Sequence, residues 1–318
     1  MKELTVISGK GGTGKTSVTA SIASLAEKRV VIDADVDAAN LFLTLEHNLI
    51  ETEQFQGGYK AEINPELCIG CKECFKRCQF DAIFEEITEN IIPKLSKQKD
   101  EQIRDNRISP KFAIDPIACE GCGVCVHFCP TGAISFERQI CGEKYISITA
   151  NGPMVHARLG IAEENSGLLV SQLRQRAREM AKEQKIPLII TDGPPGIGCP
   201  VIASISNADA LLIVTEPALS AIHDMKRVIK LGRQMNAAIY VCINKADLNK
   251  EISENIKEFC FDNNIKFAGE IPFDRAVVES MKMGKALVTY SDGAASKAVK
   301  EVWENVRLFM GDTMERVF

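Results

Sequence analysis

Apolar residues are grouped along much of the chain into short β-rich runs that alternate with longer segments of helical spacing. The first run, residues 4–8, leads into a helical pattern over 15–28 and a buried strand over 30–34. The same pattern returns late, with strands predicted at 187–191, 210–215 and 238–244 and helices predicted at 168–185 and 221–235. Such alternation predicts an α/β fold with a mostly parallel, doubly wound sheet that carries helices on both faces.

The pattern changes between residues 59 and 149, where closely spaced cysteines, glycine, proline and short strands replace it. We interpret this segment as an inserted α+β domain, so that the predicted domains are 1–58, 59–149 and 150–318. The insert contains a repeat, in which Pro65, Cys68, Cys71, Cys74, Cys78, Ala82 and Ile83 recur at identical offsets as Pro116, Cys119, Cys122, Cys125, Cys129, Ala133 and Ile134. Two pseudo-symmetric halves are therefore expected, separated by a charged, solvated stretch over 85–111.

Composition narrows the class of protein. The 318 residues are 45% hydrophobic and 25% charged, which is typical of a globular chain with one large core and a smaller module. A formal net charge of -5 gives no electrostatic footprint for nucleic acid. No signal peptide is recognisable, and no apolar run approaches the ~20 residues of a membrane span, so we expect a soluble, cytoplasmic protein without a membrane partner.

The first predicted strand is followed directly by a glycine-rich loop. It reads Gly9-Lys10-Gly11-Gly12-Thr13-Gly14-Lys15-Thr16, with Ser17 next, and it stands at a predicted helix start. In such a loop the glycines let backbone N–H groups surround phosphates, Lys15 reaches the β and γ oxygens, and the Thr16 hydroxyl ligates Mg²⁺. The alternative, a purely structural glycine loop, does not require this lysine and threonine.

The twelve cysteines of a chain without a secretion signal point to metal or redox chemistry rather than disulfides. Eight form two C-x2-C-x2-C-x3-C runs, the ferredoxin pattern for [4Fe-4S] clusters, in which the fourth cysteine of each run serves the other cluster. The first cluster is then assigned Cys68, Cys71, Cys74 and Cys129, and the second Cys119, Cys122, Cys125 and Cys78. Zinc is the alternative, although it usually takes paired rather than tripled cysteines. The first run departs from the ferredoxin pattern at one position: Gln79 follows its fourth cysteine, whereas Pro130 follows the fourth cysteine of the second run.

Because Lys10 makes the loop K-G-G-T-G-K-T, the chain resembles the MinD/ParA superfamily of deviant Walker A ATPases, and specifically those with an inserted ferredoxin domain. The resemblance implies a homodimer that sandwiches two ATP molecules, with Lys10 acting in trans on the partner's nucleotide. It also implies catalytic roles for Lys15, Asp35 and Asp192. Asp35 would orient the attacking water, Asp192 would lie near Mg²⁺, and the Gly196 N–H would lie near the γ-phosphate.

The resemblance further implies that Asn244, Pro272 and Asp274 contact the adenine, which favours ATP over GTP. Three functions follow as hypotheses. The first is nucleotide-gated electron transfer through two [4Fe-4S] clusters, with an unidentified redox donor and acceptor. The second is a cluster or metallocofactor carrier that delivers to an apoprotein, for which an exposed Cys199 would be a candidate ligand. The third is a positioning ATPase that senses redox state.

Overall fold

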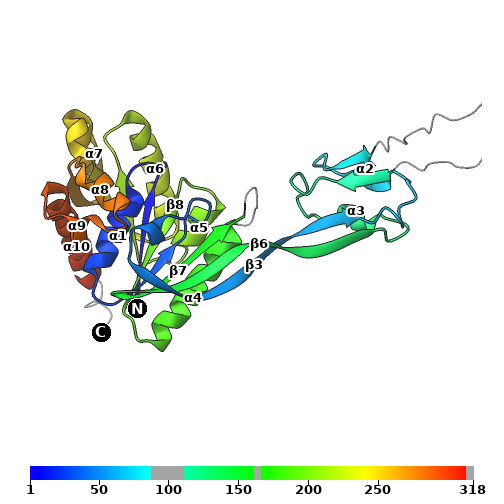
Figure 1. Cartoon of the computed structure of the whole chain (residues 1–318). Coiled ribbons are helices and arrows are strands. Elements are labelled where there is room, and N and C mark those ends of the chain that lie inside the picture. The colour runs from blue at the N-terminus through cyan, green and yellow to red at the C-terminus, as the bar shows by residue number, and fades with distance from the viewer. Residues whose placement is uncertain (87–110, 161–165, 313–318) are drawn as a thin grey trace, which may run out of the picture. The chain divides into compact units, whose positions relative to one another are not determined.

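The computed structural model describes residues 1–86, 111–160 and 166–312 (Figure 1). The chain forms two compact units, one of Met1–Phe55, Gly142–Leu159 and Asn165–Phe318, the other of Gln56–Cys141 and Gly160–Glu164. These boundaries differ from the predicted 59–149 insert because two long strands, β3 and β6, run from one unit into the other. Within the described residues, no helix has both the length and the apolar composition that crossing a membrane requires.

The first unit is built on a nine-stranded sheet in the order β11-β10-β9-β1-β8-β2-β7-β6-β3. The strands are β1 (Lys2–Ser8), β2 (Arg29–Asp33), β3 (His47–Ile63), β6 (Ile134–Thr149), β7 (Gly152–Leu159), β8 (Leu188–Pro195), β9 (Ala210–Thr215), β10 (Ala238–Asn244) and β11 (Lys266–Ile271). The strands from β11 to β7 are parallel, whereas β6 pairs antiparallel with β7. The predicted mostly parallel sheet is therefore confirmed.

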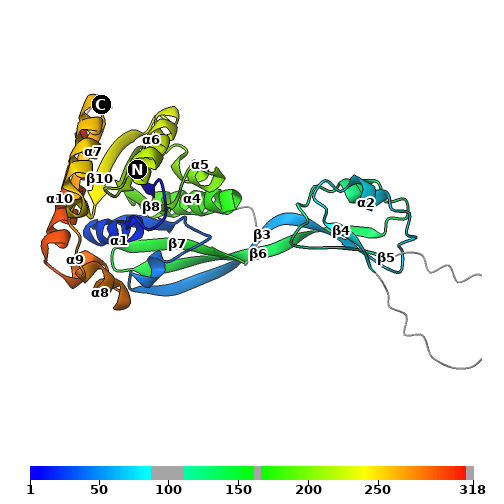
Figure 2. The same ribbon diagram turned by 90° about the horizontal axis from the view of Figure 1, so that it is seen from above.

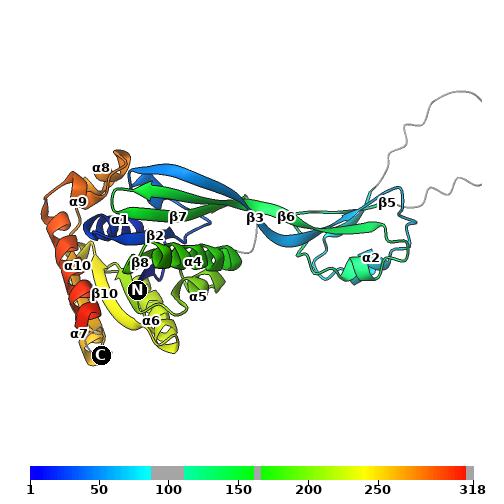
Figure 3. The ribbon, with the colours of Figure 1, turned by 90° about the horizontal axis from the view of Figure 1, so that it is seen from below.

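Helices cover both faces of this sheet (Figure 2, Figure 3). They are α1 (Lys15–Leu25), α4 (Ser166–Glu183), α5 (Cys199–Ile205), α6 (Leu219–Gln234), α7 (Lys250–Asp262), α8 (Ala276–Lys282), α9 (Leu287–Tyr290) and α10 (Ala294–Asp312), with 3-10 turns at Leu41–Leu43 and Ala246–Leu248. Successive strand residues face opposite sides. Leu212 accordingly packs with α1 and α10, whereas Leu211 and Ile213 pack with α5, α6 and α7.

The second unit contains a two-stranded antiparallel sheet of β4 (Ile83–Glu86) and β5 (Lys111–Ile114), and two short helices, α2 (Glu73–Arg77) and α3 (Val124–His127). Its small core consists of Ala61, Ile63, Cys74, Ile83, Phe112 and Ile134, with five further cysteines and three aromatic or aliphatic side chains packed against it. Most of the charged stretch predicted over 85–111 lies outside the described residues.

Candidate functional sites

The glycine loop lies at the centre of the sheet, because β1 is flanked by β8 and β9 and the carboxyl ends of these parallel strands meet at one edge. Gly12 and Gly14 adopt φ of 80° and 87°, in the left-handed region that favours glycine. A Cβ on Gly14 would lie 2.2 Å from Nδ2 of Asn244, so this position also has no room for a side chain. Helix α1 begins directly after it, at Lys15.

Asp192, in β8, is fully buried and accepts three hydrogen bonds from the start of α1. The donors are Lys15 Nζ at 2.8 Å to Oδ1, Thr16 Oγ1 at 2.7 Å to Oδ2, and Thr19 Oγ1 at 2.8 Å to Oδ1. The structure thus brings together Lys15, predicted to bind phosphate, and Thr16 and Asp192, both predicted to lie at the Mg²⁺ ion. Thr19 was not predicted, although its position four residues after Lys15 puts it on the same face of the helix.

Two more carboxylates are those of Asp33, the last residue of β2, and Asp35, just after it; β2 pairs with β8 so that Asp33 is in register with Asp192. Asp33 is fully buried and accepts N–H groups of Asp35, Asn40 and Leu41 at 3.3, 3.1 and 2.9 Å. Burial, followed by the charge of Asp192, raises the pKa of Asp33 to about 7. Asp35 Oδ2 lies 3.7 Å from Lys15 Nζ. Asp33 therefore holds the backbone of the loop that presents Asp35 at the site.

Lys10 is engaged within its own chain. Its Nζ lies 2.7 Å from Glu216 Oε1, and Lys245 Nζ lies 3.1 Å from the other oxygen of the same carboxylate. Lys245 also donates to the carbonyl of Gly12 at 3.1 Å. Burial raises the pKa of Glu216, but the hydrogen bonds from Lys10 and Lys245 outweigh burial and hold this pKa below its ordinary value. Glu216 follows β9 directly and was not predicted.

A cavity of about 480 Å³ extends from the glycine loop to the segment after β11. Its lining includes the predicted Gly11, Gly12, Thr13, Gly14, Lys15, Thr16, Ser17, Asp35, Asn244, Pro272 and Asp274. The far end is apolar, with Phe273, Val277, Val278 and Met281, which were not predicted. Thr13 Oγ1 is buried and has no hydrogen-bond partner among the described residues. An orphaned hydroxyl in a glycine loop suits a phosphate acceptor, so these residues fit a nucleotide.

Two predicted contacts are arranged differently. The Gly196 N–H donates to the carbonyl of Ser8 at 2.9 Å, because β8 continues to pair with β1 as far as Pro195, after a register shift between Val6 and Ser8. The Asn244 amide donates to the carbonyl of Thr13 at 2.8 Å, so that in this structure it supports the loop rather than pointing at a base.

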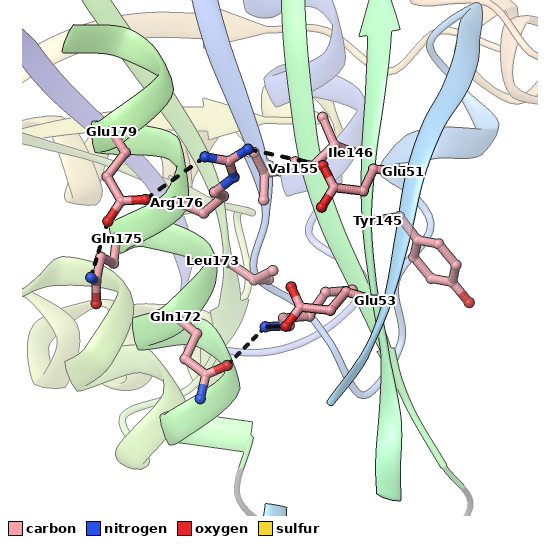
Figure 4. A pocket seen from close by; sticks show the side chains of 11 residues that line it. Glu51, Glu53, Tyr145, Ile146, Val155, Gln172, Leu173, Gln175, Arg176 and Glu179 are labelled. Carbon is pink, nitrogen blue, oxygen red and sulfur yellow. Dashed lines mark hydrogen bonds and ion pairs between the residues drawn. The ribbon is translucent and has the colours of Figure 1, made fainter. Parts of the chain in front are cut away.

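A second hollow of the first unit, about 230 Å³ between α4 and strands β3, β6 and β7, has charged walls (Figure 4). Its cations are already paired: Arg176 lies 3.9 Å from Glu51, and Lys144 lies 3.0 Å from Glu53 and donates to Gln172 at 3.2 Å. With three carboxylates against two cations, the hollow does not suit a triphosphate.

In the second unit, the two cysteine runs fold into loops with the same backbone. Left-handed φ values recur at Gly70 and Gly121 (67° and 62°), and at Lys72 and Gly123 (67° and 73°). A third pair is Asp81 and Gly132, with φ of 52° and 63°. Each equivalent pair is 51 residues apart, the interval of the sequence repeat. Alternating left-handed turns direct N–H groups inward and form concavities that suit anionic groups such as iron-sulfur clusters.

The halves also exchange equivalent hydrogen bonds. Asn64 N–H donates to the carbonyl of Ala133 at 2.7 Å, and Asp115 N–H donates to the carbonyl of Ala82 at 2.8 Å. Each bond joins one half to the other and is the image of its partner under the repeat. The predicted pseudo-symmetry is therefore present in the backbone.

The eight thiols are free, and Cys74 belongs to the small core with five of the others packed against it. Burial, followed by the thiols of Cys119, Cys122 and Cys74, raises the pKa of Cys125 to about 11. Over the described ranges, no three His, Cys, Asp or Glu side chains gather where one metal ion could bind. Thiolates that share one ion at about 2.3 Å must nearly touch, whereas those of a four-iron cluster each bind a different iron and lie farther apart. Eight thiols in two runs are the donor type that four-iron clusters require, so the residues present fit such clusters.

Cys199 is exposed at the first residue of α5, in the first unit. It belongs to the first unit, whereas the two cysteine runs belong to the second.

A central strand that leads through a glycine loop into a helix, beside a strand that carries a buried aspartate, defines a P-loop nucleoside triphosphatase. The chain matches the CobQ/CobB/MinD/ParA nucleotide binding domain over residues 4–288 and belongs to that family. It is thus a MinD/ParA-type ATPase.

An uncharacterized protein of Methanocaldococcus jannaschii is 31% identical over 97% of this chain and 97% of its own length. An iron-sulfur cluster carrier protein of Pyrococcus abyssi is 27% identical over 44% of this chain and 52% of its own length. Among solved structures, the septum site-determining protein MinD of Pyrococcus horikoshii, complexed with Mg-ADP, superimposes with a TM-score of 0.55 at 17% identity, covering 98% of this chain and 97% of that one. At this identity the superposition shows the fold alone.

Proposed function

We propose that the chain is a homodimeric ATPase that couples ATP binding and hydrolysis to electron transfer through two [4Fe-4S] clusters held by its second unit. The observation that carries the proposal is the occurrence of a nucleotide site and two backbone-matched cysteine loops in one chain.

In the nucleotide site, the glycine loop and Lys15 would bind the phosphates of ATP, with the Ser17 segment of α1 completing the cradle. Thr16 Oγ1 and Asp192 Oδ2 lie 2.7 Å apart, and these two side chains would hold Mg²⁺. Asp35, beside them, would orient water. The apolar end of the cavity, near Pro272 and Asp274, would receive the base. Lys10 would leave Glu216 and act on the partner's nucleotide.

In the second unit, the first cluster would be bound by Cys68, Cys71, Cys74 and Cys129, and the second by Cys119, Cys122, Cys125 and Cys78. Such clusters supply one-electron exchange with a redox partner protein. The chain contributes the thiolates, the inward N–H groups of the two loops and the apolar packing around Cys74. One such bond is already formed, since the N–H of Ala133 donates to Cys129 Sγ at 3.3 Å.

The test is to purify the full chain without oxygen, to measure iron and acid-labile sulfide, and to follow cluster reduction by EPR with and without Mg-ATP. We expect about eight iron atoms per chain and a nucleotide-dependent change in the reduction of the clusters. The same change should be absent in Lys15→Ala, which retains the clusters but lacks the phosphate lysine. Fewer than about five iron atoms, or reduction that is indifferent to ATP, would refute the coupling.

A second candidate function, cluster delivery, is favoured by the similarity to the Pyrococcus abyssi iron-sulfur cluster carrier protein. It predicts that the clusters leave the chain. Incubation of the loaded protein with an apo-ferredoxin, followed by separation and iron analysis of both, distinguishes the two functions. Transfer of cluster to the apoprotein supports delivery, whereas full retention supports electron transfer.

A further inference from the structure

The repeat of the second unit makes Lys60 and Lys111 equivalent, since they stand 51 residues apart like the paired cysteines. Their surroundings differ. Lys60 is half-buried, and its Nζ donates to the carbonyls of Pro116 at 2.6 Å and Cys119 at 3.1 Å. Lys111 is exposed, and among the described residues it makes no such bond to Pro65 or Cys68. Among the described residues, an ammonium is therefore bound in this way to the loop of the second cysteine run and not to that of the first.

The lysine is fixed there by close backbone packing. A Cβ on Gly121 would lie 2.0 Å from the carbonyl oxygen of Tyr59, the residue before Lys60. The ring of Tyr59 stacks on Phe136, with centroids 4.8 Å apart. The strand that carries Lys60 thus packs directly against the loop that carries Cys119 and Cys122, which keeps the backbone of Lys60 beside that loop.

The charges around the first run are balanced. Lys72 lies 3.4 Å from Glu85, and Lys76 and Arg77 lie 3.6 and 2.9 Å from Glu73. Each of these cations is therefore paired with a carboxylate. By contrast, the recorded partners of Lys60 are neutral carbonyls.

Two other carboxylates, those of Glu62 and Glu137, line the hollow of about 520 Å³ that Lys60 borders. Neither is within ion-pair distance of Lys60 in the described structure. Glu120 stands next to Cys119 in the chain, but its carboxylate is exposed, so water screens its charge more than that of the half-buried Lys60.

Reduction adds a negative charge to an iron-sulfur cluster, and a nearby cation stabilises that charge; net charge and hydrogen bonding are the means by which a protein sets cluster potentials. We propose that Lys60 makes the cluster bound by Cys119, Cys122 and Cys125 the more easily reduced of the two, so that an electron entering the unit rests there. This inference rests on the proposed function, because it presupposes that both cysteine runs hold clusters. Lys60 is a tuning residue and is assigned no contact with a substrate.

The test compares Lys60→Met with Lys111→Met in the full, anaerobically prepared chain, by redox titration monitored by EPR. In the unchanged chain we expect two midpoint potentials. Lys60→Met should shift the higher one to a more negative value and bring the two closer together, whereas Lys111→Met should leave both in place. Lys60→Arg, which keeps the charge, should keep the separation.

Iron and sulfide analysis of each variant separates the possible failures. If the unchanged chain lacks the clusters, the proposed function fails and the inference with it. If all variants contain both clusters and Lys60→Met leaves the two potentials unchanged, the inference alone is wrong. If Lys60→Met loses iron, Lys60→Gln and Lys60→Arg, both with clusters retained, take its place. A shift of the higher midpoint potential in Lys60→Gln and none in Lys60→Arg supports the inference. The same two potentials in both variants overturn it.

Discussion

Asp192 shows how the site is assembled residue by residue. A fully buried carboxylate requires several donors, and here a lysine, Lys15, and two hydroxyls, those of Thr16 and Thr19, supply them from two turns of one helix. Lys15 and Thr16 have partners in the nucleotide and Mg²⁺ as well. Thr19 lies deeper, so its bond to Asp192 would persist when the other two turn to ligands.

Thr19→Val should therefore weaken hydrolysis without removing nucleotide binding. The substitution conserves shape but removes the hydroxyl that orients Asp192, and we expect kcat to fall about tenfold, the equivalent of one such bond. The Mg²⁺ concentration for half-maximal ATPase activity should rise as well. Thr19→Ser, which keeps the hydroxyl, is the matched control and should stay close to the unchanged chain. Equal Mg²⁺ dependence in both variants would show that Asp192 needs no third donor.

Glu216 gives a second prediction at this scale, because its carboxylate binds both Lys10 and Lys245. If Lys10 must leave Glu216 to reach a partner's nucleotide, Glu216→Gln should favour the dimer. The pair is partly exposed, so the ATP-dependent dimerisation constant should increase only several-fold, in keeping with about 1 kcal/mol or less. Light scattering at a series of protein concentrations measures it. Glu304→Gln, which removes a surface partner of Arg307, should cause no change.

At the scale of elements, helix α4 is tied to the sheet by a buried ion pair. Arg174 Nη2 donates to Glu3 Oε2 of β1 at 2.6 Å, and Arg174 Nη1 donates to the carbonyls of Ala203 and Ser206 at the end of α5 at 2.7 and 2.6 Å. One side chain thus joins a strand and two helices. Arg178 donates to Glu3 as well, at 2.9 Å to Oε2.

Arg174→Met should accordingly lower the free energy of unfolding by about 3 kcal/mol, because it leaves buried oxygens without donors. Arg176→Met, on the same helix, is the control. Arg176 is 43% exposed and its ion pairs are 3.8 and 3.9 Å long, so we expect a loss of less than about 1 kcal/mol. Urea unfolding followed by fluorescence of Trp303, the single tryptophan, measures both. Similar losses in the two variants would contradict a special role for the buried pair.

Strand β7 contributes a prediction on pH. His156 is buried, stacks on Phe42 and Tyr145, and has its Nε2 3.0 Å from Ser147 Oγ. Burial, followed by the charge of His47, lowers the pKa of His156 to about 4. Between this value and about 6.5 the unfolded chain binds the extra proton and the folded chain does not, so stability rises with pH across this window.

The expected contribution of His156 is about 3 kcal/mol over the whole window. His156→Gln should flatten the dependence of unfolding free energy on pH from about 4 to 6.5, measured by Trp303 fluorescence. The exposed His223 provides the control, and His223→Gln should leave the slope as it is. A slope that survives in His156→Gln would place the titrating group elsewhere.

The elements that could be predicted from the sequence are those buried on both faces. Strands β9 and β10 were placed correctly at 210–215 and 238–244 because continuous apolar runs are typical of a covered parallel sheet. Strands β3 and β6 were not predicted. The first half of β3 is exposed and shows no alternation of apolar and polar residues, and the alternation over residues 59–63 is too short to reveal the whole strand.

The site residues that could be predicted are likewise those that belong to a short contiguous motif. The loop residues from Gly9 to Thr16 and both cysteine runs carry their chemistry in fixed spacing and could be predicted. Glu216 could not, because its role depends on a contact with Lys10 that joins residues 206 positions apart in the chain. Its place just after the carboxyl end of β9 was the available signal.

At the scale of the whole molecule, the nucleotide site and the cysteine loops belong to separate units, each with its own core. The chain passes between them through β3 and β6, which are neighbours in the sheet. The first unit should then fold without the second. Replacing residues 57–140 by an Asn-Gly turn would close β3 and β6 into a hairpin and remove all eight cysteines of the two runs.

We expect this shortened chain to bind ATP with an affinity close to that of the full chain, measured by calorimetry, and to contain no iron. Lys15→Ala in the same background is the control and should abolish binding. Loss of ATP binding in a folded shortened chain would mean that the second unit completes the nucleotide site. Retention would mean that the cysteine unit is an addition to a self-sufficient ATPase, so that any effect of ATP on the clusters must pass through the segments that join the two units, β3 and β6 among them, or through a partner chain.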